Sequence, residues 1–358
     1  MGFIKVIVLL TFPSSYIFTS QLVAKYKETV RKYREEYKWN EDPETNLSVS
    51  GSGIGDKTVV ASKDSIAMGH VLLAQNLGFI KPEINIWRKY GWHLAGRYSD
   101  DKGKPLFLDP QKKEEMLRTR GLVAKLPRSE QFVFANALLS SDPDGTIPLI
   151  QCMDDSVTES DLQDRYFAAV SKWYERKAQI ELNSTRRNFY AAEKARFAKS
   201  EKEGGYGKIH RESQIYPRLH FLRDTGFVMK ERSEFSLSDL AKDFKKQLTS
   251  LDDKAVSKLL DDKENNLGIL LAENYGKGLV ALTDEEFERQ FSHFTAFYKY
   301  IGLIMIPYED LYFSILASSL DFSKSLSYAE YGEKIVQLAK VRKFDFSTRI
   351  PGRRYIRA

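Results

Sequence analysis

A few acidic and basic residues in the middle of the chain have the types that a metal-dependent nuclease uses. Such an enzyme needs an acidic residue followed by Glu-x-Lys on a strand, so that carboxylates hold the ion that activates water. Glu175-Arg-Lys177 follows Asp155 by 20 residues, but Trp173 and Ile180 are spaced around it for a helix. Glu36-Tyr-Lys38 also lies in a segment with helical spacing and not on a predicted strand. We interpret both as solvated helix faces and predict no catalytic residue.

Two other patterns suggest ligand chemistry and fail on their details. Gly51-Ser-Gly-Ile-Gly-Asp-Lys-Thr58 is similar to a phosphate-binding loop, but Asp56 occupies the place of the Gly that precedes Lys, and no apolar strand precedes it. We interpret it as a flexible loop. The five histidines are scattered without metal-ligand spacing, and His93 beside Trp92 is expected to pack against aromatic neighbours. We therefore predict no cofactor and no metal site.

The basic residues are concentrated in two parts of the chain. The net charge is +6, and residues 165–223 hold 14 Lys and Arg against 6 Glu, whereas residues 252–288 hold 10 acidic residues against 4 Lys. This separation is typical of a polyanion-binding face, although ordinary solvated helix faces would also explain the middle block. Arg211, Gln214 and Arg218 follow helical spacing, and Arg and Gln pair with guanine and adenine edges, so these three and Arg223 are predicted to read bases.

The second basic part is the C-terminal tail, which we expect to contact the phosphate backbone. Arg suits this role because its planar guanidinium holds phosphate oxygens with two hydrogen bonds. Seven basic residues stand against Asp345 alone: Lys340, Arg342, Lys343, Arg349, Arg353, Arg354 and Arg357.

The elements that must position these residues are indicated by a recurring glycine. Gly78, Gly121, Gly226 and Gly302 each follow a segment of helical character and precede an apolar pair. Glycine ends helices in this way because it takes a positive φ without a Cβ clash. A helix, a Gly cap and a buried strand in succession predict small helix-turn-helix-like modules in series.

The clearest module spans residues 210–244. Residues 216–226 are predicted to form a helix and its cap, residues 227–237 a two-stranded wing, and residues 238–244 a helix capped by Ser238. At the C-terminus, residues 328–344 predict a helix with Tyr331, Ile335, Leu338 and Val341 inward, followed by strands at residues 344–346 and 355–356.

Other segments are predicted from their periodicity and turn residues. Residues 160–203 are predicted to form one or two long helices. Residues 131–140 are predicted to form a helix that is closed by a turn at 142–145. Residues 84–98 are predicted to form strands or a packed cap. The aromatic residues from Phe287 to Tyr300 are expected to pack a core, with stacking on single-stranded bases as the alternative.

The 210–244 module resembles the winged-helix domains of regulators, restriction proteins and defence proteins. The fold class is thus predicted as α-rich α+β, with winged-helix-like modules over 1–158, 206–290 and 291–358 and a central helical segment over 159–205. The resemblance implies a subunit that binds nucleic acid, with duplex DNA favoured, and lacks catalytic activity of its own, as in prokaryotic defence or restriction complexes. A protein partner would carry the chemistry.

An alternative from another class is a protein-docking subunit, since winged helices also occur in the kleisin and related accessory subunits of chromosome-organising ATPases. The single cysteine, Cys152, excludes an intramolecular disulfide and fits the cytoplasm. The apolar segment from Val6 to Phe12 is short for a signal peptide, so a buried strand or helix is expected there, and no segment is long enough to predict a membrane span.

Overall fold

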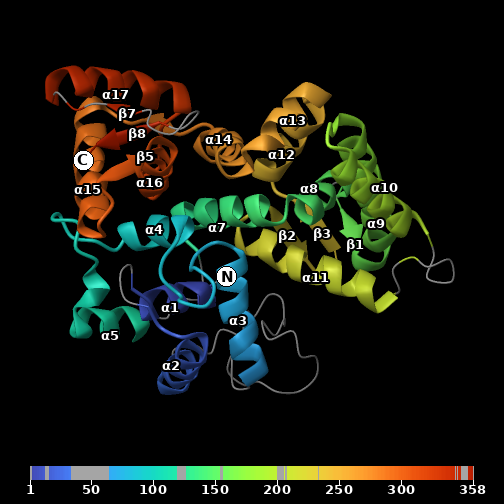
Figure 1. Cartoon of the computed structure of the whole chain (residues 1–358), viewed down its shortest axis with the longest axis horizontal. Coiled ribbons are helices and arrows are strands. Elements are labelled where there is room, and N and C mark those ends of the chain that lie inside the picture. The colour runs from blue at the N-terminus through green and yellow to red at the C-terminus, as the bar shows by residue number, and fades with distance from the viewer. Residues whose placement is uncertain are drawn as a thin grey trace. The chain divides into compact units, whose positions relative to one another are not determined.

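The computed structural model divides the chain into two compact units. One unit combines residues 1–137 with residues 275–358, and the other comprises residues 138–274. These divisions fall at other places than the boundaries predicted at 158, 205 and 290. The structure describes residues 2–12, 16–33, 64–118, 126–153, 156–199, 205, 208–232, 234–342, 344, 346–347 and 354–357. Long helices and short strands make up these residues, which confirms the α-rich α+β class (Figure 1).

The N-terminal part of the first unit is helical. Its elements are α1 (Gly2–Leu10), α2 (Thr19–Lys32), α3 (Asp64–Asn76), α4 (Lys89–Gly96), a 3-10 turn (Leu106–Leu108), α5 (Pro110–Arg118) and α7 (Arg128–Ser141), which continues into the second unit. Every residue of α1 is buried, which confirms a buried N-terminal segment. None of the helices within the described residues is long and apolar enough to cross a membrane. Strands or a packed cap were predicted over residues 84–98. The structure has one bridge there, from Trp87 to Ile80, and packs the aromatic residues that follow as helix α4.

The C-terminal part of the first unit combines three helices with a small antiparallel sheet. Its elements are β4 (Val280–Ala281), α15 (Asp284–Tyr300), β5 (Met305–Pro307), α16 (Tyr308–Leu320), β6 (Lys324–Ser325), α17 (Tyr328–Arg342), β7 (Phe346–Ser347) and β8 (Tyr355–Arg357). The sheet order is β5-β8-β7, with Ile356 opposite both Ile306 and Phe346. β4 and β6 form a separate parallel pair. The predicted helix and the two strands after it are therefore confirmed, and β8 is the central strand.

An aromatic core holds this part together. Phe287, Phe291, Phe294, Phe297 and Tyr298 of α15 are buried, as predicted for core packing, whereas Tyr300, at the end of the helix, is 46% exposed. The ring of Tyr331 on α17 packs edge-on against Phe287 and donates its hydroxyl hydrogen to the carbonyl of Tyr308 at 3.0 Å. Aromatic side chains thus fix α17 against both α15 and α16.

The second unit repeats this order of elements with longer helices. Its elements are α8 (Pro143–Cys152), β1 (Val157–Thr158), α9 (Glu159–Ile180), α10 (Ser184–Ala198), α11 (Lys208–Asp224), β2 (Val228–Glu231), β3 (Glu234–Leu237), α12 (Asp239–Ser250), α13 (Asp253–Asp261) and α14 (Lys263–Gly276). The antiparallel sheet has the order β1-β3-β2. The two long helices, the hairpin and the Ser238 cap, whose hydroxyl accepts from the amide of Ala241, are all confirmed.

Glycine ends helices at three of the four predicted positions. Gly78, Gly226 and Gly302 have φ values of 74°, 76° and 88°. At Gly226 the amide donates to the carbonyl of Arg223, and the next amide, of Phe227, donates to Leu222 at 2.8 Å. This is the Schellman arrangement, which closes the last carbonyls of a helix before a strand. Gly121 lies outside the described residues.

The turn predicted at residues 142–145 is wrong. Asp142 is the N-cap of α8, and its carboxylate accepts from the amide of Gly145 at 3.2 Å. Pro143 occupies the first helical position, where its missing N–H costs nothing. The same residue types that make turns also begin helices, so α7 and α8 follow each other directly.

Candidate nucleic-acid interface

The predicted base-reading residues of α11 are engaged within the second unit. The guanidinium of Arg218 donates from Nε to Oδ2 of Asp142 at 2.6 Å and from Nη1 to Oε1 of Gln214 at 2.6 Å. Only 18% of the Arg218 side chain is exposed. Burial alone lowers the pKa of Arg218, but attraction to Tyr166 and Asp142 outweighs it and leaves the pKa raised. Arg218 therefore joins α11 to the start of α8 as a permanent cation.

The backbone around Asp142 is shaped to receive this guanidinium. A Cβ placed on Gly145 would lie 2.2 Å from Nε of Arg218, which no real side chain tolerates. Arg223, near the end of α11, is mostly buried, and its nearest described acid is Asp224 at 3.8 Å. The side chain of Arg211 lies outside the described residues. Base reading by Arg218 and Gln214 would thus require the contact with Asp142 to open, and the role of all four residues stays a prediction.

The tail residues divide into paired and exposed ones. Arg342 donates to Glu288 and, at 3.1 Å, to the hydroxyl of Ser292, both on α15. Lys340 and Arg357 are exposed. Lys343, Arg349 and Arg353 lie outside the described residues.

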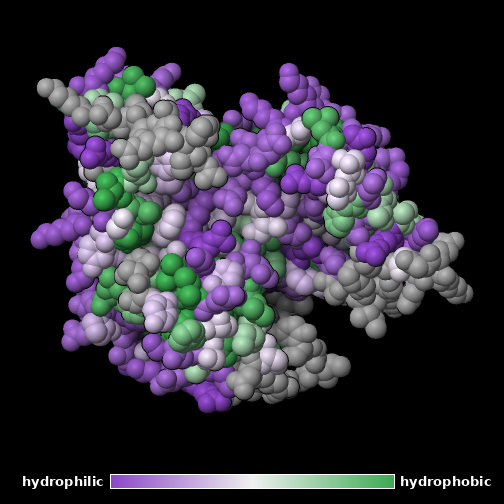
Figure 2. Space-filling model, viewed as in Figure 1, coloured by the Kyte–Doolittle hydropathy of each residue, from purple (hydrophilic) through white to green (hydrophobic). Residues whose placement is uncertain are grey.

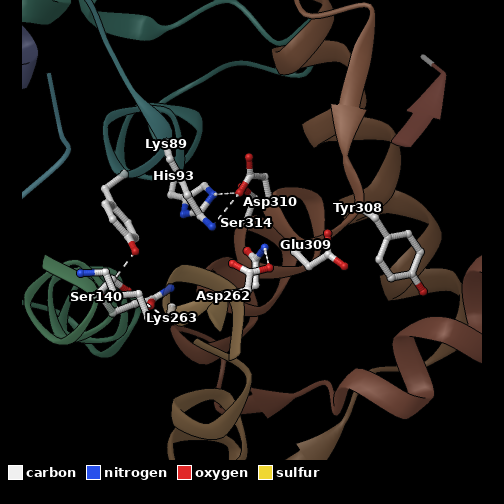
Figure 3. A network of polar contacts seen from close by, with 12 residues as sticks. Lys89, His93, Ser140, Asp262, Lys263, Tyr308, Glu309, Asp310 and Ser314 are labelled. Carbon is white, nitrogen blue, oxygen red and sulfur yellow. Dashed lines mark hydrogen bonds and ion pairs between the residues drawn. The ribbon is translucent and has the colours of Figure 1, made fainter. Parts of the chain in front are cut away.

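Arg354 lies at the base of the predicted wing. Its guanidinium stacks over the ring of Tyr308 at 4.0 Å and donates to the hydroxyl of Tyr328 at 2.6 Å. Tyr328 donates in turn to Glu309 at 2.8 Å. Figure 3 shows Tyr308 and Glu309 on α16. This cation–π contact fixes the start of β8 against α16, so a phosphate contact from Arg354 would compete with the contacts that hold the sheet.

The outer face of α17 is mixed in character. Val341 was predicted to point inward and is 78% exposed, because it lies in the last turn of α17, where none of the described elements covers it. Exposed side chains along this helix include Glu333, Val336, Gln337 and Lys340. The charges of Glu333 and Lys340 offset each other and leave this set of side chains near neutral. Gln337 is its uncharged hydrogen-bonding group, and Val336 and Val341 lie beside it.

Much of the basic block over residues 165–223 forms ion pairs within the second unit. The pairs are Arg176 with Asp253, Lys177 with Asp144, Lys194 with Glu175, Arg196 with Glu193, and Arg218 with Asp142. Glu175 and Lys177 therefore join α9 to neighbouring helices. The predicted solvated helix face is wrong for Lys177, whose side chain is buried against Asp144 and Tyr190. Asp155 lies outside the described residues. The exposed basic side chains gather on the α9–α10 hairpin: Lys172, Arg186, Arg187 and Lys199.

A lysine-lined hollow on α12 was missed by the sequence reasoning. It has a volume of about 520 Å³ and lies over Met153 and Leu237, beside Lys242, Lys245 and Lys246. The Nζ of Lys245 donates to the carbonyl of Met153 at 2.7 Å. The signal was available, since the three lysines and Thr249 fall at i, i+3, i+4 and i+7 of one helix face. None of the described lining residues is acidic, so the hollow suits an anionic group.

One cluster of polar groups with catalytic potential lies largely buried between α4 and α16. Lys89 and His93 of α4 point toward Asp310 of α16, with nitrogen to oxygen distances of 3.3 and 3.6 Å (Figure 3). Burial alone would raise the pKa of Asp310, but Lys89 and His93 outweigh it and hold the pKa below its ordinary value. His93 also packs edge-on against Tyr90, which confirms its predicted aromatic surroundings. The cluster joins α4 to α16 and is closed to solvent.

No group of three or more potential metal ligands lies together in the part of the chain that the structure describes. The face of the molecule in Figure 2 is largely hydrophilic, with scattered hydrophobic side chains. Comparison of the chain with family models, curated proteins and solved structures found no match. Functional reasoning therefore depends on the residues and the topology themselves.

Proposed function

We propose that this chain is a nucleic-acid-binding protein with one winged-helix module in each unit. The observation that carries the proposal is the repeated topology. In each unit a helix, a strand, further helices and a two-stranded hairpin succeed one another, and the third strand lies between the first and the second. This is the order of a winged helix, in which the last helix before the hairpin enters a DNA groove. That helix is α17 in the first unit and α11 in the second.

Binding would depend mainly on the phosphate backbone. Lys340 and Arg357 in the first unit, and Lys242 and Lys246 of α12 in the second, would supply exposed positive charge that releases counterions from duplex DNA. Gln337 on α17 is the described side chain suited to an adenine edge, and Val336 can contact a thymine methyl group. With so few base-reading side chains on its exposed face, α17 would give weak sequence preference.

The chain would act as a recognition subunit in the cytoplasm without catalytic activity of its own. This part of the proposal is supported by the ion pairs that occupy Glu175 and Lys177. A protein partner would supply the chemistry, as in prokaryotic restriction or defence complexes. Duplex DNA is the proposed ligand.

A second function, protein docking in the manner of kleisin-like accessory subunits, is favoured by one observation. Val336 and Val341 are exposed on the near-neutral outer face of α17. An apolar face of this kind also suits a partner protein. In this case the chain would show little affinity for DNA at any salt concentration.

The test is fluorescence anisotropy of the full chain with a labelled duplex of about 30 base pairs at about 50 and 200 mM salt. If about six phosphates are contacted, affinity should fall by about a thousandfold between the two concentrations. Absence of binding at low salt would overturn the proposal and favour docking.

A paired variant tests the proposed module in the first unit. Lys340→Gln with Arg357→Gln should weaken binding to all sequences and reduce the salt slope by about two. Lys254→Gln with Lys258→Gln, on exposed positions of α13, removes the same charge and should leave the affinity unchanged. Deleting the tail is unsuitable because β8 is the central strand of its sheet.

A further inference from the structure

The α9–α10 hairpin leaves one helix almost entirely uncovered. Within the 15 residues of α10, only Glu193 and Phe197 are buried. Figure 1 shows α10 running alongside α9 within the second unit. In the second unit, α9 and α10 lie between β1 and α11, where the first unit has α16 followed by α17. The hairpin is thus a longer insertion into the shared topology.

The facing sides of α9 and α10 pack against each other. Phe197 packs against Phe167 and Tyr174, with ring centroids 5.1 and 5.8 Å apart. Lys177 lies over the ring of Tyr190 at 4.1 Å, and Ser171 donates to the carbonyl of Lys194 at 3.3 Å. These contacts fix the two helices against each other, so the outer face of α10 is presented on a rigid support.

The end of the hairpin where the chain turns combines apolar and basic side chains. Leu182, in the turn, is 91% exposed, and Phe189, in the second turn of α10, is 55% exposed. Arg186 is exposed one helical turn before Phe189. Arg187 donates from Nε and Nη2 to the carbonyl of Glu181 at 3.0 and 2.8 Å, and its side chain is exposed.

Basic residues predominate on this surface. Between residues 181 and 199 the acidic residues are Glu181, whose carboxylate accepts from the amide of Asn183 at 2.9 Å, and Glu193, which is buried and paired with Arg196 at 2.9 Å. Small residues at 185 and 192 flank Phe189 at i−4 and i+3, so the ring is not covered along the helix. Over α9 and α10, pale green and white side chains lie among purple ones in Figure 2. An anionic partner with flat apolar groups would complement this surface.

We propose that the turn end of the α9–α10 hairpin binds unpaired bases where duplex and single-stranded nucleic acid meet. Phe189 stacks on a base, Leu182 packs beside it, and Arg186 and Arg187 contact the adjoining phosphates, which is the chemistry of single-strand binding. Two apolar residues separated by Thr185 and Asn188 are too few for the continuous apolar face that membrane binding needs. The inference rests on the proposed function, because it names the form of nucleic acid that the chain prefers.

The experiment compares two labelled probes with the full chain: a blunt duplex of about 20 base pairs and the same duplex with an overhang of about 10 nucleotides. Wild type should bind the overhang probe about five- to tenfold more tightly. Leu182→Ser with Phe189→Ser should abolish this preference and leave the affinity for the blunt duplex unchanged. Arg186→Gln should weaken binding to both probes.

A matched control replaces a similarly exposed aliphatic and aromatic pair of the first unit, Val280→Ser with Phe322→Ser. This control should keep the preference for the overhang. The inference is overturned if wild type shows no preference, or if the Leu182 and Phe189 variant retains it. Binding to vesicles of phosphatidylserine and phosphatidylcholine that the same variant abolishes would also overturn it, in favour of a membrane. Failure of wild type to bind either probe would instead overturn the proposed function itself.

Discussion

The ammonium group of Lys5 lies 2.7 Å from Oε2 of Glu130, and both side chains are shielded from solvent. Glu130 also accepts from the hydroxyl of Tyr98 and forms an ion pair with Arg97, both just after the end of α4. Burial lowers the pKa of Lys5, and attraction to Glu130 opposes this effect. One carboxylate therefore ties α1 and the end of α4 to α7.

Replacing Lys5 should destabilise the first unit strongly. Lys5→Met should lower the free energy of unfolding by about 2–4 kcal/mol, because it leaves Glu130 buried with Arg97 as its remaining cation. Urea denaturation measures this loss. Lys81→Met, on an exposed lysine, should change the stability by less than about 0.5 kcal/mol. Equal stability of the two variants would contradict a buried ion pair at Lys5.

Replacing Arg218 should affect stability before it affects recognition. Arg218→Ala should cost about 1.5–3 kcal/mol, because Asp142 loses a charge-assisted hydrogen bond in a partly buried site. Gly145→Ala should also destabilise the unit, since its Cβ would displace the guanidinium. A double-mutant cycle with Asp142→Asn measures the coupling. If Arg218→Ala instead kept full stability and altered discrimination between DNA sequences, Arg218 would be a base-reading residue.

The left-handed cap at the end of α11 predicts a cost for any side chain with a Cβ. Gly226→Val should lower the free energy of unfolding by about 1–2 kcal/mol, because φ is 76° at this position. Gly69→Ala serves as the control, since Gly69 lies within α3 and nothing is within 4 Å of an added Cβ. That substitution should be neutral or stabilising. A neutral Gly226→Val in thermal unfolding would contradict the cap.

The partly buried His70 predicts a loss of stability in mild acid. Burial lowers its pKa to about 3, from 6.5 in the unfolded chain. Below pH 6.5 the unfolded chain therefore binds a proton that the folded chain does not, so stability falls as the pH falls. The slope is up to about 1.4 kcal/mol per pH unit until the pH nears 3.

His70→Gln should remove the contribution of His70 to the pH dependence of the free energy of unfolding. Urea denaturation at pH 7.5 and 5.0 should then show a difference about 1–2 kcal/mol smaller than in wild type. His293→Gln is the comparison variant. Nε2 of His293 lies 3.1 Å from the hydroxyl oxygen of Ser99 and 3.2 Å from the carbonyl oxygen of Gly96. An unchanged pH dependence in His70→Gln would show that another group titrates.

The sequence by itself determined the local elements of this protein. Helix periodicity, the Ser238 cap and the glycine caps at Gly226 and Gly302 predicted α11, the β2–β3 hairpin and the path from α15 into β5. These features depend on neighbours within one or two helical turns, where propensity and capping act directly. Local signals were ambiguous where the same residue types occur both in turns and at the start of helices. Asp142 and Pro143 were predicted to form a turn and instead begin α8.

Only the tertiary structure decided which charged side chains remain available to contact a ligand. Arg218 meets Asp142 76 residues away, Arg342 meets Glu288, and Arg354 lies on Tyr308. Likewise the first unit forms from both ends of the chain, through contacts such as Lys89 with Asp310. A periodic pattern records which face of a helix is polar, but the partner of a charge is set by which distant segments fold against that face. The sequence therefore determined where positive charge is abundant, and the fold decided that much of it is neutralised and that an exposed basic surface lies on the α9–α10 hairpin.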